Sequence, residues 1–274
     1  MLFRSRLVRT FPQDYLLDAL DPGLFGTEEA PWLPAPQLRV NNVPARLVAT
    51  AEAAWAALHP ELTERLKRAD GFLRQRSIYS AREEIRAGLT ALSRKLDQLA
   101  NTENESSGSQ RKLAIRKSMP HESSLQHAFR ALDECGFVPQ EEIGENLQTF
   151  VDLIPRATLN HPWASDLVYA LGKTYEHEYE QDPKRAEVIR KQALECFVVA
   201  SRIAPRRGAL ANQLGYSYLQ AGMTEEAFKA LRQSLDAGPT ATTWRNLAEL
   251  YRRQGATREA RLADEQAEYL LKME

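Results

Sequence analysis

The sequence predicts an all-α protein, a right-handed α-solenoid of helical hairpins preceded by an irregular arm and further helices. Three stretches of the C-terminal half share one pattern, a leucine followed by a small residue and, three positions later, a tyrosine. The stretches begin at Leu171, Leu214 and Leu247, and the last two lie 33 residues apart. A repeat of this length predicts stacked units, because each unit has to pack on its neighbour to bury its apolar face.

The second helix of each unit is predicted by small and apolar residues at fixed offsets from the motif. In the second unit the matching positions are Leu214, Gly215, Tyr218, Gly222, Ala227, Leu231, Ser234 and Pro239, and in the third they are Trp244, Leu247, Ala248, Tyr251, Gly255, Ala260 and Ala267. This order resembles the tetratricopeptide repeat (TPR), whose pattern runs W-x2-L-G-x2-Y, then A-x3-F, then P. The resemblance covers residues 165–274 and is degenerate or absent upstream.

Three positions depart from the family pattern. Val168 and Ala211 stand where the pattern has tryptophan, and Asp264 stands where it has an apolar residue. The small residues fit the resemblance for a physical reason, since two helices of a hairpin approach closely only where their side chains are short.

The first unit is longer than the other two. Gly172 and Ala193 are 21 residues apart, whereas the equivalent residues of the later units are 12 apart. The added residues include Asp182 and Pro183, a favourable N-cap and first helical residue. A helical turn takes about 3.6 residues, so the spacing predicts that both helices are longer by about a turn. We interpret this as a length change at a surface turn, with a partner contact as the alternative.

Residues 1–43 predict an irregular N-terminal arm, because their prolines interrupt any long helix. The arm carries the aromatic residues Phe11, Tyr15, Phe25 and Trp32. We expect part of it to pack on the protein's own helices, with packing on a partner as the alternative.

Residues 44–99 predict a helical region with three apolar stripes at helical spacing. The stripes are Leu47, Ala51, Ala54 and Leu58; Leu62, Leu66, Ala69 and Leu73; and Ile85, Leu89, Leu92, Leu96 and Leu99. Ala69, Phe72, Ala81 and Ile85 reproduce the offsets of the later units, so a degenerate repeat is one interpretation and a plain helical bundle is the other.

Residues 100–120 are polar and predict a flexible linker. Residues 121–274 are then expected to form the TPR-like solenoid, beginning with a hairpin whose two helices are separated at Gly136. Its apolar residues are Leu125, Phe129, Leu132 and Cys135 in the first helix and Ile143, Leu147, Phe150 and Ile154 in the second. Trp163 follows this hairpin, and we expect it to pack between adjacent hairpins.

The protein is close to neutral, so its net charge gives no general electrostatic attraction to nucleic acid or to an anionic membrane. The chain has 36 basic and 37 acidic residues and a net charge of −1. No apolar stretch approaches the length of about 20 residues that a membrane span requires. Cys135 and Cys196 form no metal-binding or secreted-type pattern, which favours a reducing, cytoplasmic location.

No motif for catalysis or for a cofactor stands out. The sequence has no glycine-rich phosphate loop, no G-x-S-x-G elbow and no H-E-x-x-H pair. Glu176, His177 and Glu178 are consecutive, so on a helix their side chains diverge and do not converge on a metal. We therefore expect a protein that is not an enzyme and that holds no cofactor or metal.

The resemblance to TPR proteins implies a concave groove, lined by the first helices of successive repeats, that binds an extended peptide. Carried over position by position, the candidates for this groove are Tyr169, Lys173, Asn212, Tyr216, Arg245 and Glu249. Aromatic, amide and cationic side chains suit the side chains, backbone and carboxylates of a peptide. Lys173, Asn212 and Arg245 match the family's carboxylate clamp only in part, because Tyr216 and Glu249 depart from it.

Two functions remain open on the sequence alone. The first is a non-enzymatic scaffold or adaptor that binds a protein or peptide partner in the groove. The second is a regulatory or docking subunit of a larger assembly that uses the N-terminal helices for oligomerisation. The sequence leaves the partner and the oligomeric state open.

Overall fold

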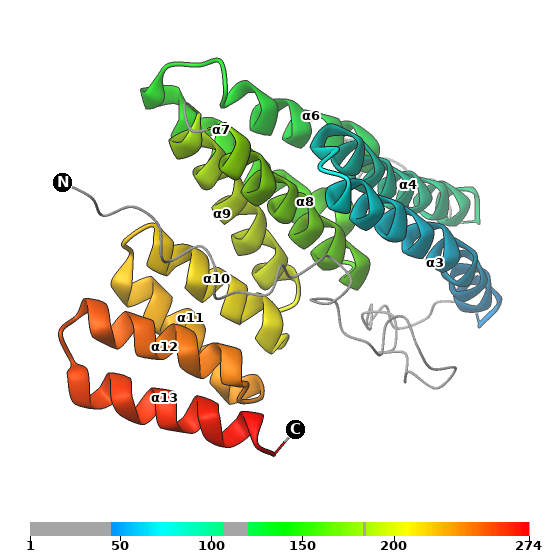
Figure 1. The fold of residues 1–274 in the computed structure, drawn as a ribbon. Helices are drawn as coiled ribbons and strands as arrows, with labels where there is room; N and C mark the ends of the chain where they lie inside the picture. Colours follow the sequence, from blue (N-terminus) through cyan, green and yellow to red (C-terminus); the bar gives the residue numbers. More distant parts are fainter. Residues whose placement is uncertain (1–44, 107–119, 183–184, 274) are drawn as a thin grey trace.

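The computed structural model describes residues 45–106, 120–182 and 185–273, which form ten α-helices and no strand (Figure 1). The predicted all-α class is confirmed for this part of the chain. The helices are α3 (Ala45–Arg74), α4 (Ile78–Ser106), α6 (His121–Glu134), α7 (Gln140–Thr158), α8 (Pro162–Gln181), α9 (Ala186–Ile203), α10 (Gly208–Gln220), α11 (Thr224–Ala237), α12 (Ala241–Arg253) and α13 (Thr257–Leu271). The predicted arm of residues 1–43 lies outside the described residues. Of the predicted linker 100–120, the first part belongs to α4 and residues 107–119 lie outside.

The helices pair in sequence order into five antiparallel hairpins, α3–α4, α6–α7, α8–α9, α10–α11 and α12–α13. The second helix of one hairpin contacts the first helix of the next: α9 contacts α10, and α11 contacts α12. The first helices α10 and α12 also contact each other. This is the stacking of a helical solenoid, in which each hairpin buries its apolar face against its neighbour.

The hairpin α6–α7 lies outside this row of hairpins. Helices α3 and α4 both contact α8, so the α3–α4 hairpin takes the place next to α8–α9 although α6–α7 separates them in sequence. The α6–α7 hairpin packs instead on the second helices of its neighbours, α6 on α4 and α7 on both α4 and α9 (Figure 1). The chain thus leaves the row after α4 and returns to it at α8.

The α6–α7 hairpin is fixed to α4 by its N-terminus. The carboxylate of Asp97 on α4 accepts hydrogen bonds from the backbone N–H groups of His121 and Glu122, at 2.9 and 3.0 Å. These two groups have no partner inside α6 because they belong to its first turn. A carboxylate at this end is also favoured by the helix dipole.

The small residues of the repeats let the paired helices approach closely. A Cβ atom added at Gly172 would lie 2.6 Å from the ring of Phe197, and one added at Gly215 would lie 2.7 Å from Cγ of Leu231. The helices of the first unit are longer than those of the second, as the spacing predicts: α8 and α9 have 20 and 18 residues, whereas α10 and α11 have 13 and 14.

The buried apolar residues form two clusters. The larger cluster reaches from α3 to α11 and includes the predicted stripe of α3 from Leu58 onward, that of α4 as far as Leu92, and those of α6 and α7. The smaller cluster joins α10, α11 and α12 through Leu219, Ala227, Leu231, Leu247 and Leu250. The apolar residues of α3 and α4 from Leu58 to Leu92 therefore pack inside the molecule, where the first hairpin contacts α8.

The start of α8 brings two histidines and a tryptophan together. Trp163 is buried between α8 and α3, where its ring meets that of His59 edge-on with centroids 4.9 Å apart. Its position between two hairpins is the one that the sequence predicts. His161 is the N-cap of α8, and its Nδ1 accepts a hydrogen bond from the N–H of Trp163 at 3.3 Å.

We expect His161 to make the protein less stable below neutral pH. Burial lowers the pKa of His161 to about 4 from its ordinary value of 6.5. As the pH falls from 6.5 toward 4, only the unfolded chain takes up the proton, so stability present above pH 6.5 is lost over this window. Between pH 7 and pH 5 the loss should be on the order of 1 kcal/mol, a value reduced because the side chain is partly exposed.

Urea unfolding at pH 7 and pH 5 measures this loss in the natural protein and in His161→Asn. Asparagine keeps an N-cap acceptor but does not titrate. The variant should lose less stability on acidification. Equal losses in the two proteins would assign the pH dependence to other groups, such as His59, whose pKa burial also lowers.

Candidate interaction surface

The first helices of the last three hairpins are linked by hydrogen bonds between their side chains and backbone. Nε2 of Gln213 on α10 donates to Glu176 on α8 at 2.7 Å, and Nδ2 of Asn246 on α12 donates to Oδ1 of Asn212 on α10 at 2.9 Å. Arg253 at the end of α12 donates to the carbonyl oxygen of Leu219 at 2.6 Å. These bonds define a continuous surface over α8, α10 and α12, which we call the first-helix face.

The structure places the two candidates of α8 differently. Tyr169 is only 3% exposed, and its ring packs on that of Phe197 with centroids 5.6 Å apart. Lys173 is half-buried, and its Nζ lies 2.7 Å from a carboxylate oxygen of Glu176. Tyr169 therefore lies in the interior of the α8–α9 hairpin, because α8 is covered by α3, α4 and α9.

The other four candidates lie on two helices that contact each other, α10 and α12. Asn212 and Tyr216 of α10 are half-buried, and Arg245 of α12 is exposed. Glu249 is half-buried one turn after Arg245, 3.0 Å from Nε of Arg253. This part of the first-helix face therefore presents an amide, a phenol, a carboxylate and a cation within two adjacent helices.

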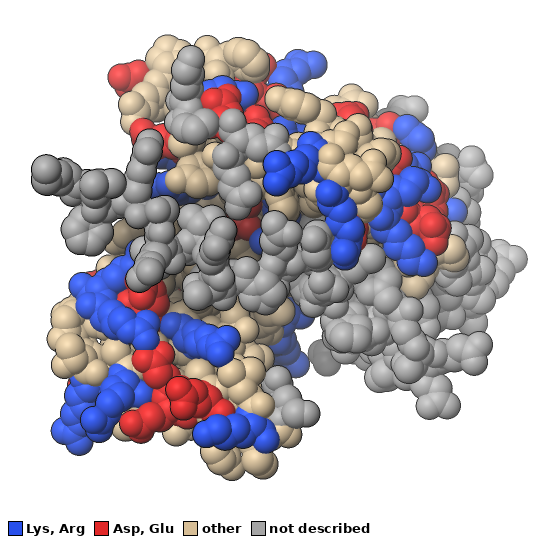
Figure 2. Space-filling model, in the orientation of Figure 1, with Lys and Arg blue, Asp and Glu red and all other residues tan. Residues whose placement is uncertain are grey.

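Arg252 and Arg253 add to the positive charge of α12 and were not among the sequence candidates. Arg252 forms ion pairs with Glu249 and with Asp264 of α13, and Arg253 pairs with Glu249. Figure 2 shows basic and acidic side chains gathered over the C-terminal hairpins. The spacing of four residues from Glu249 to Arg253 is the signal in the sequence, since residues at i and i+4 meet on a helix surface.

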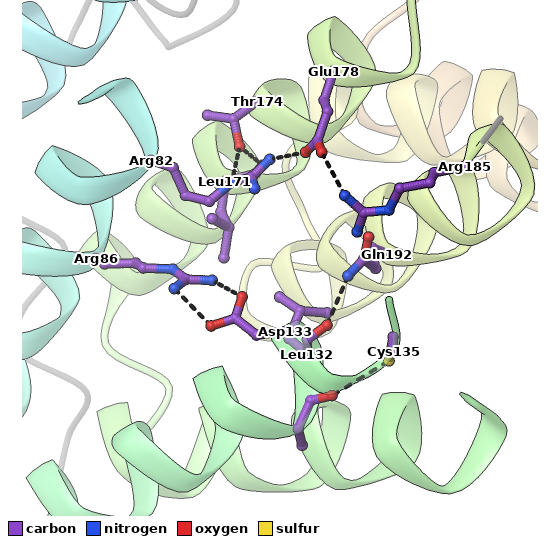
Figure 3. Close-up of polar contacts among 11 residues, drawn as sticks. Arg82, Arg86, Leu132, Asp133, Cys135, Leu171, Thr174, Glu178, Arg185 and Gln192 are labelled. Carbon is purple, nitrogen blue, oxygen red and sulfur yellow. Dashed lines mark hydrogen bonds and ion pairs between the residues drawn. The ribbon is translucent and has the colours of Figure 1, made fainter. Parts of the chain in front are cut away.

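A buried network of charges joins the α3–α4 hairpin to the α8–α9 hairpin (Figure 3). Nη2 of Arg82 on α4 donates to Glu178 on α8 at 2.6 Å, and Nε donates to Oγ1 of Thr174 at 3.2 Å. The guanidinium of Arg82 also lies over the ring of Tyr175, 3.9 Å from its centroid. Arg185, just before α9, donates to the other oxygen of Glu178 at 3.4 Å.

A second arginine of α4, Arg86, connects α4 to α6. Arg86 donates from both terminal nitrogens to the carboxylate of Asp133, with Nη1 at 2.9 Å (Figure 3). Burial disfavours the charge of Arg86, but the hydrogen bonds to Asp133 outweigh it and raise its pKa. Gln192 on α9 donates to the carbonyl oxygen of Leu132 at 2.7 Å. These contacts position hairpins and do not form a catalytic arrangement.

A shallow pocket of about 470 Å³ lies between α3, α4 and α6, away from the first-helix face. It is lined by Glu61, Arg65, Glu83, Arg86, Ala87, Thr90, Ala91, Arg94 and Phe129. Its arginines are each bound to a carboxylate: Arg65 to Glu61, Arg86 to Asp133 and Arg94 to Glu122. The pocket therefore offers little unpaired charge to a ligand.

Both cysteines of the chain are buried in the larger apolar cluster. Cys196 is fully buried, and burial raises the pKa of its thiol. Burial also raises the pKa of Cys135, to about 11. Among residues 45–106, 120–182 and 185–273, no group of three His, Cys, Asp or Glu side chains converges on a metal position. Within the same residues, no helix has both the length and the apolar character needed to cross a bilayer.

The solved structures similar to this chain include the crystal structure of a thermophilic TPR protein from Thermus thermophilus. The two chains are 20% identical over 76% of this chain and 91% of the other, with a TM-score of 0.37. No family model matches the chain, and no curated protein matches it. The assignment of the fold rests on the helices described above and on their pairing.

Proposed function

We propose that this protein is a non-enzymatic interaction scaffold of the TPR type that binds an extended peptide segment of a partner protein on the first-helix face. The supporting observation is that Asn212 and Tyr216 lie on α10, that Arg245 and Glu249 lie on α12, and that these two first helices of the hairpin stack contact each other. Neither Lys173 nor Tyr169 is required for this part of the face.

The chemistry of the face suits a segment with at least one carboxylate. Arg245 is exposed, and it makes no hydrogen bond or ion pair with any residue that the structure describes. A guanidinium of this kind binds a carboxylate through two parallel N–H bonds. Tyr216 offers a ring for an apolar side chain. Oδ1 of Asn212 already accepts a hydrogen bond from Asn246 of α12, so Asn212 would contact a peptide backbone through its amide N–H groups.

The proposal includes the organisation and location expected from the sequence. We propose residues 1–43 as an arm, 44–99 and 121–274 as the helical parts, and 100–120, whose first part continues α4 to Ser106, as the connection between them. The two buried thiols fit a reducing, cytoplasmic setting. The docking-subunit alternative would have to use surfaces other than the apolar residues of α3 and α4 from Leu58 to Leu92, which are buried in the larger cluster.

Affinity purification from the native host tests this function. The double variant Tyr216→Ala/Arg245→Ala should lose at least one partner by about tenfold or more, as expected for removal of central contact residues. The matched control is Tyr269→Ala/Arg258→Ala, which removes an exposed tyrosine and arginine from α13. Quantitative mass spectrometry compares the three partner profiles.

The partner profiles show whether binding takes place on the first-helix face. Loss of a partner in the first variant alone supports binding on the first-helix face. Identical partner profiles in the natural protein and in Tyr216→Ala/Arg245→Ala would exclude this face as the binding surface. Thermal unfolding of both variants checks that neither change unfolds the stack, which matters most for Tyr216 because it is half-buried.

A further inference from the structure

Large apolar side chains that remain exposed are concentrated at α13. In the described parts of the chain eight such side chains are exposed, and four of them lie between residues 262 and 273. These four are Leu262, Tyr269, Leu271 and Met273, with exposed fractions of 47%, 57%, 44% and 71%. The other four occur singly, one in α4 and three in turns between helices. Single exposed apolar residues are ordinary, whereas a group of them on one helix indicates an interaction surface.

Three of these residues form a line on the outer side of α13, which we call the α13 stripe. Tyr269 follows Leu262 by seven residues, or two helical turns, and Met273 follows Tyr269 by four. The buried side of the helix consists of Ala260, Ala263 and Ala267. Among the described helices α13 packs mainly on α12, and Figure 1 shows it at the edge of the stack. The α13 stripe is therefore turned away from α12.

The charges beside the α13 stripe change sign along the helix. Arg258 and Arg261 lie beside its first half, and Glu265 and Glu268 lie beside its second half. All four side chains are exposed. A partner with charges of one sign would be attracted at one half and repelled at the other. A second copy of the same helix, turned end to end, is attracted at both halves.

One antiparallel arrangement suits the apolar and the charged residues together. Leu262 and Tyr269 are seven residues apart, and so are Arg261 and Glu268, displaced by one position. A two-fold axis near Glu265 therefore brings Leu262 of each copy to Tyr269 of the other, and Arg261 of each copy to Glu268 of the other. An interface between two identical patches has to be self-complementary in this way. A parallel pairing would instead place each of these charges against its own copy.

The contacts that already exist within α13 do not prevent this pairing. Arg261 pairs with Glu265 at 3.4 Å, but the two side chains are 76% and 56% exposed. Ion pairs as exposed as this one are weak, so Arg261 can turn toward a carboxylate of the second copy. Glu259 and Lys272 reverse the sign of the charge at the two ends of the helix. The antiparallel pairing brings Glu259 of one copy to the end that carries Lys272 of the other.

We propose that the outer side of α13 is an interface between two copies of this chain, packed antiparallel about a two-fold axis near Glu265. Helix α13 has 15 residues, a length of about 22 Å. A contact between two single helices of this length belongs with the small, transient interfaces below about 1,200 Å². We therefore expect a reversible dimer with a dissociation constant on the order of 100 µM.

This inference goes beyond the proposed function and does not rest on it. The α13 stripe is turned away from α12, so pairing through it leaves the first-helix face of each copy open. A dimer then carries two such faces, and a partner with two binding segments would be held more tightly by the dimer than by one chain.

Sedimentation equilibrium of the full chain, at concentrations from about 5 to about 500 µM, measures the association. The average mass should rise with concentration from 31.0 kDa toward twice that value. Arg261→Glu should weaken the association by about tenfold or more, because it places carboxylates opposite each other at two symmetric positions. Arg261→Glu/Glu268→Arg exchanges the two signs and should restore the association to within about threefold of that of the natural protein. The matched control Lys229→Glu makes the same charge change at an exposed residue of α11 and should have no effect.

Partner capture separates this inference from the proposed function. Tyr269→Ala/Arg258→Ala removes the aromatic residue of the α13 stripe, so it should weaken self-association by about tenfold and still capture the partners of the first-helix face. Tyr216→Ala/Arg245→Ala should lose a partner and still form the dimer. Either proposal can therefore fail while the other stands.

Three outcomes overturn the inference. A monomeric mass over the whole concentration range would show that another molecule, or another part of the same chain, covers the α13 stripe. A dimer that Arg261→Glu and Lys229→Glu weaken equally would be formed through a different surface. If Arg261→Glu/Glu268→Arg has the circular dichroism of the natural protein but does not recover the association, Arg261 and Glu268 do not face each other across the axis.

Discussion

Replacing Glu178 by alanine is expected to lower the free energy of unfolding by about 3–5 kcal/mol, because the change leaves a buried arginine without its carboxylate. Glu178 is 6% exposed and Arg82 is 8% exposed, so water does not substitute for the missing partner. The two residues lie 96 positions apart and join α4 to α8. Urea unfolding followed by circular dichroism measures the loss.

Two control variants separate the buried pair from ordinary surface charge. Glu187→Ala removes an exposed carboxylate whose partner Lys191 is 3.0 Å away, and the expected change is less than about 0.5 kcal/mol. The double variant Arg82→Met/Glu178→Leu removes both buried charges together and should recover most of the stability lost in Glu178→Ala. If Glu178→Ala were no more harmful than Glu187→Ala, the pair would not be what holds α4 to α8.

Gly215→Val is expected to destabilise the protein by about 2–3 kcal/mol, because the added side chain overfills the contact between α10 and α11. A Cβ atom at this position meets Cγ and Cδ2 of Leu231 at 2.7 and 2.8 Å and the backbone nitrogen of Leu231 at 3.1 Å. Leu231 is fully buried. Because a backbone atom lies so near, a rotamer change of Leu231 alone does not relieve the clash.

Gly144 on α7 provides a control of opposite sign. It also lies within a helix, but a Cβ added there meets no atom within 4 Å. Gly144→Ala should therefore stabilise the protein by about 0.5–1 kcal/mol through helix propensity. Thermal unfolding of the two variants side by side measures both effects. A stabilising Gly215→Val would mean that α10 and α11 are not closely packed at this point.

Much of the fold could be predicted because its signals are local. The periodic apolar residues and the small residues at Gly172, Gly215 and Ala248 locate the helices of the repeats and the faces on which they pair. The extra length of the first unit also follows from spacing alone. The place of the α6–α7 hairpin could not be predicted, because it depends on contacts such as Asp97 with the N-terminus of α6, which no local pattern records.

The interaction surface could also be predicted only in part. The offsets of the repeat give the helix face on which Arg245 and Tyr216 lie, since residues at equivalent positions of stacked helices share a side. They give no measure of burial, so they treat Tyr169 in the same way as Arg245, although Tyr169 is packed on Phe197. The ion pair of Arg82 with Glu178 gives no sequence signal either, because buried and exposed charges look alike in a sequence.

The position of the α6–α7 hairpin outside the row affects how cooperatively the molecule unfolds. In a strictly linear array each unit depends only on its sequence neighbours, and the ends fray independently. Here the contact of α4 with α8 bridges an intervening hairpin, so the first three hairpins are expected to open as one unit. The C-terminal hairpins are joined through a smaller apolar cluster. The surface with Arg245 thus belongs to the less stable end of the molecule, where a bound ligand would also restrict local opening motions.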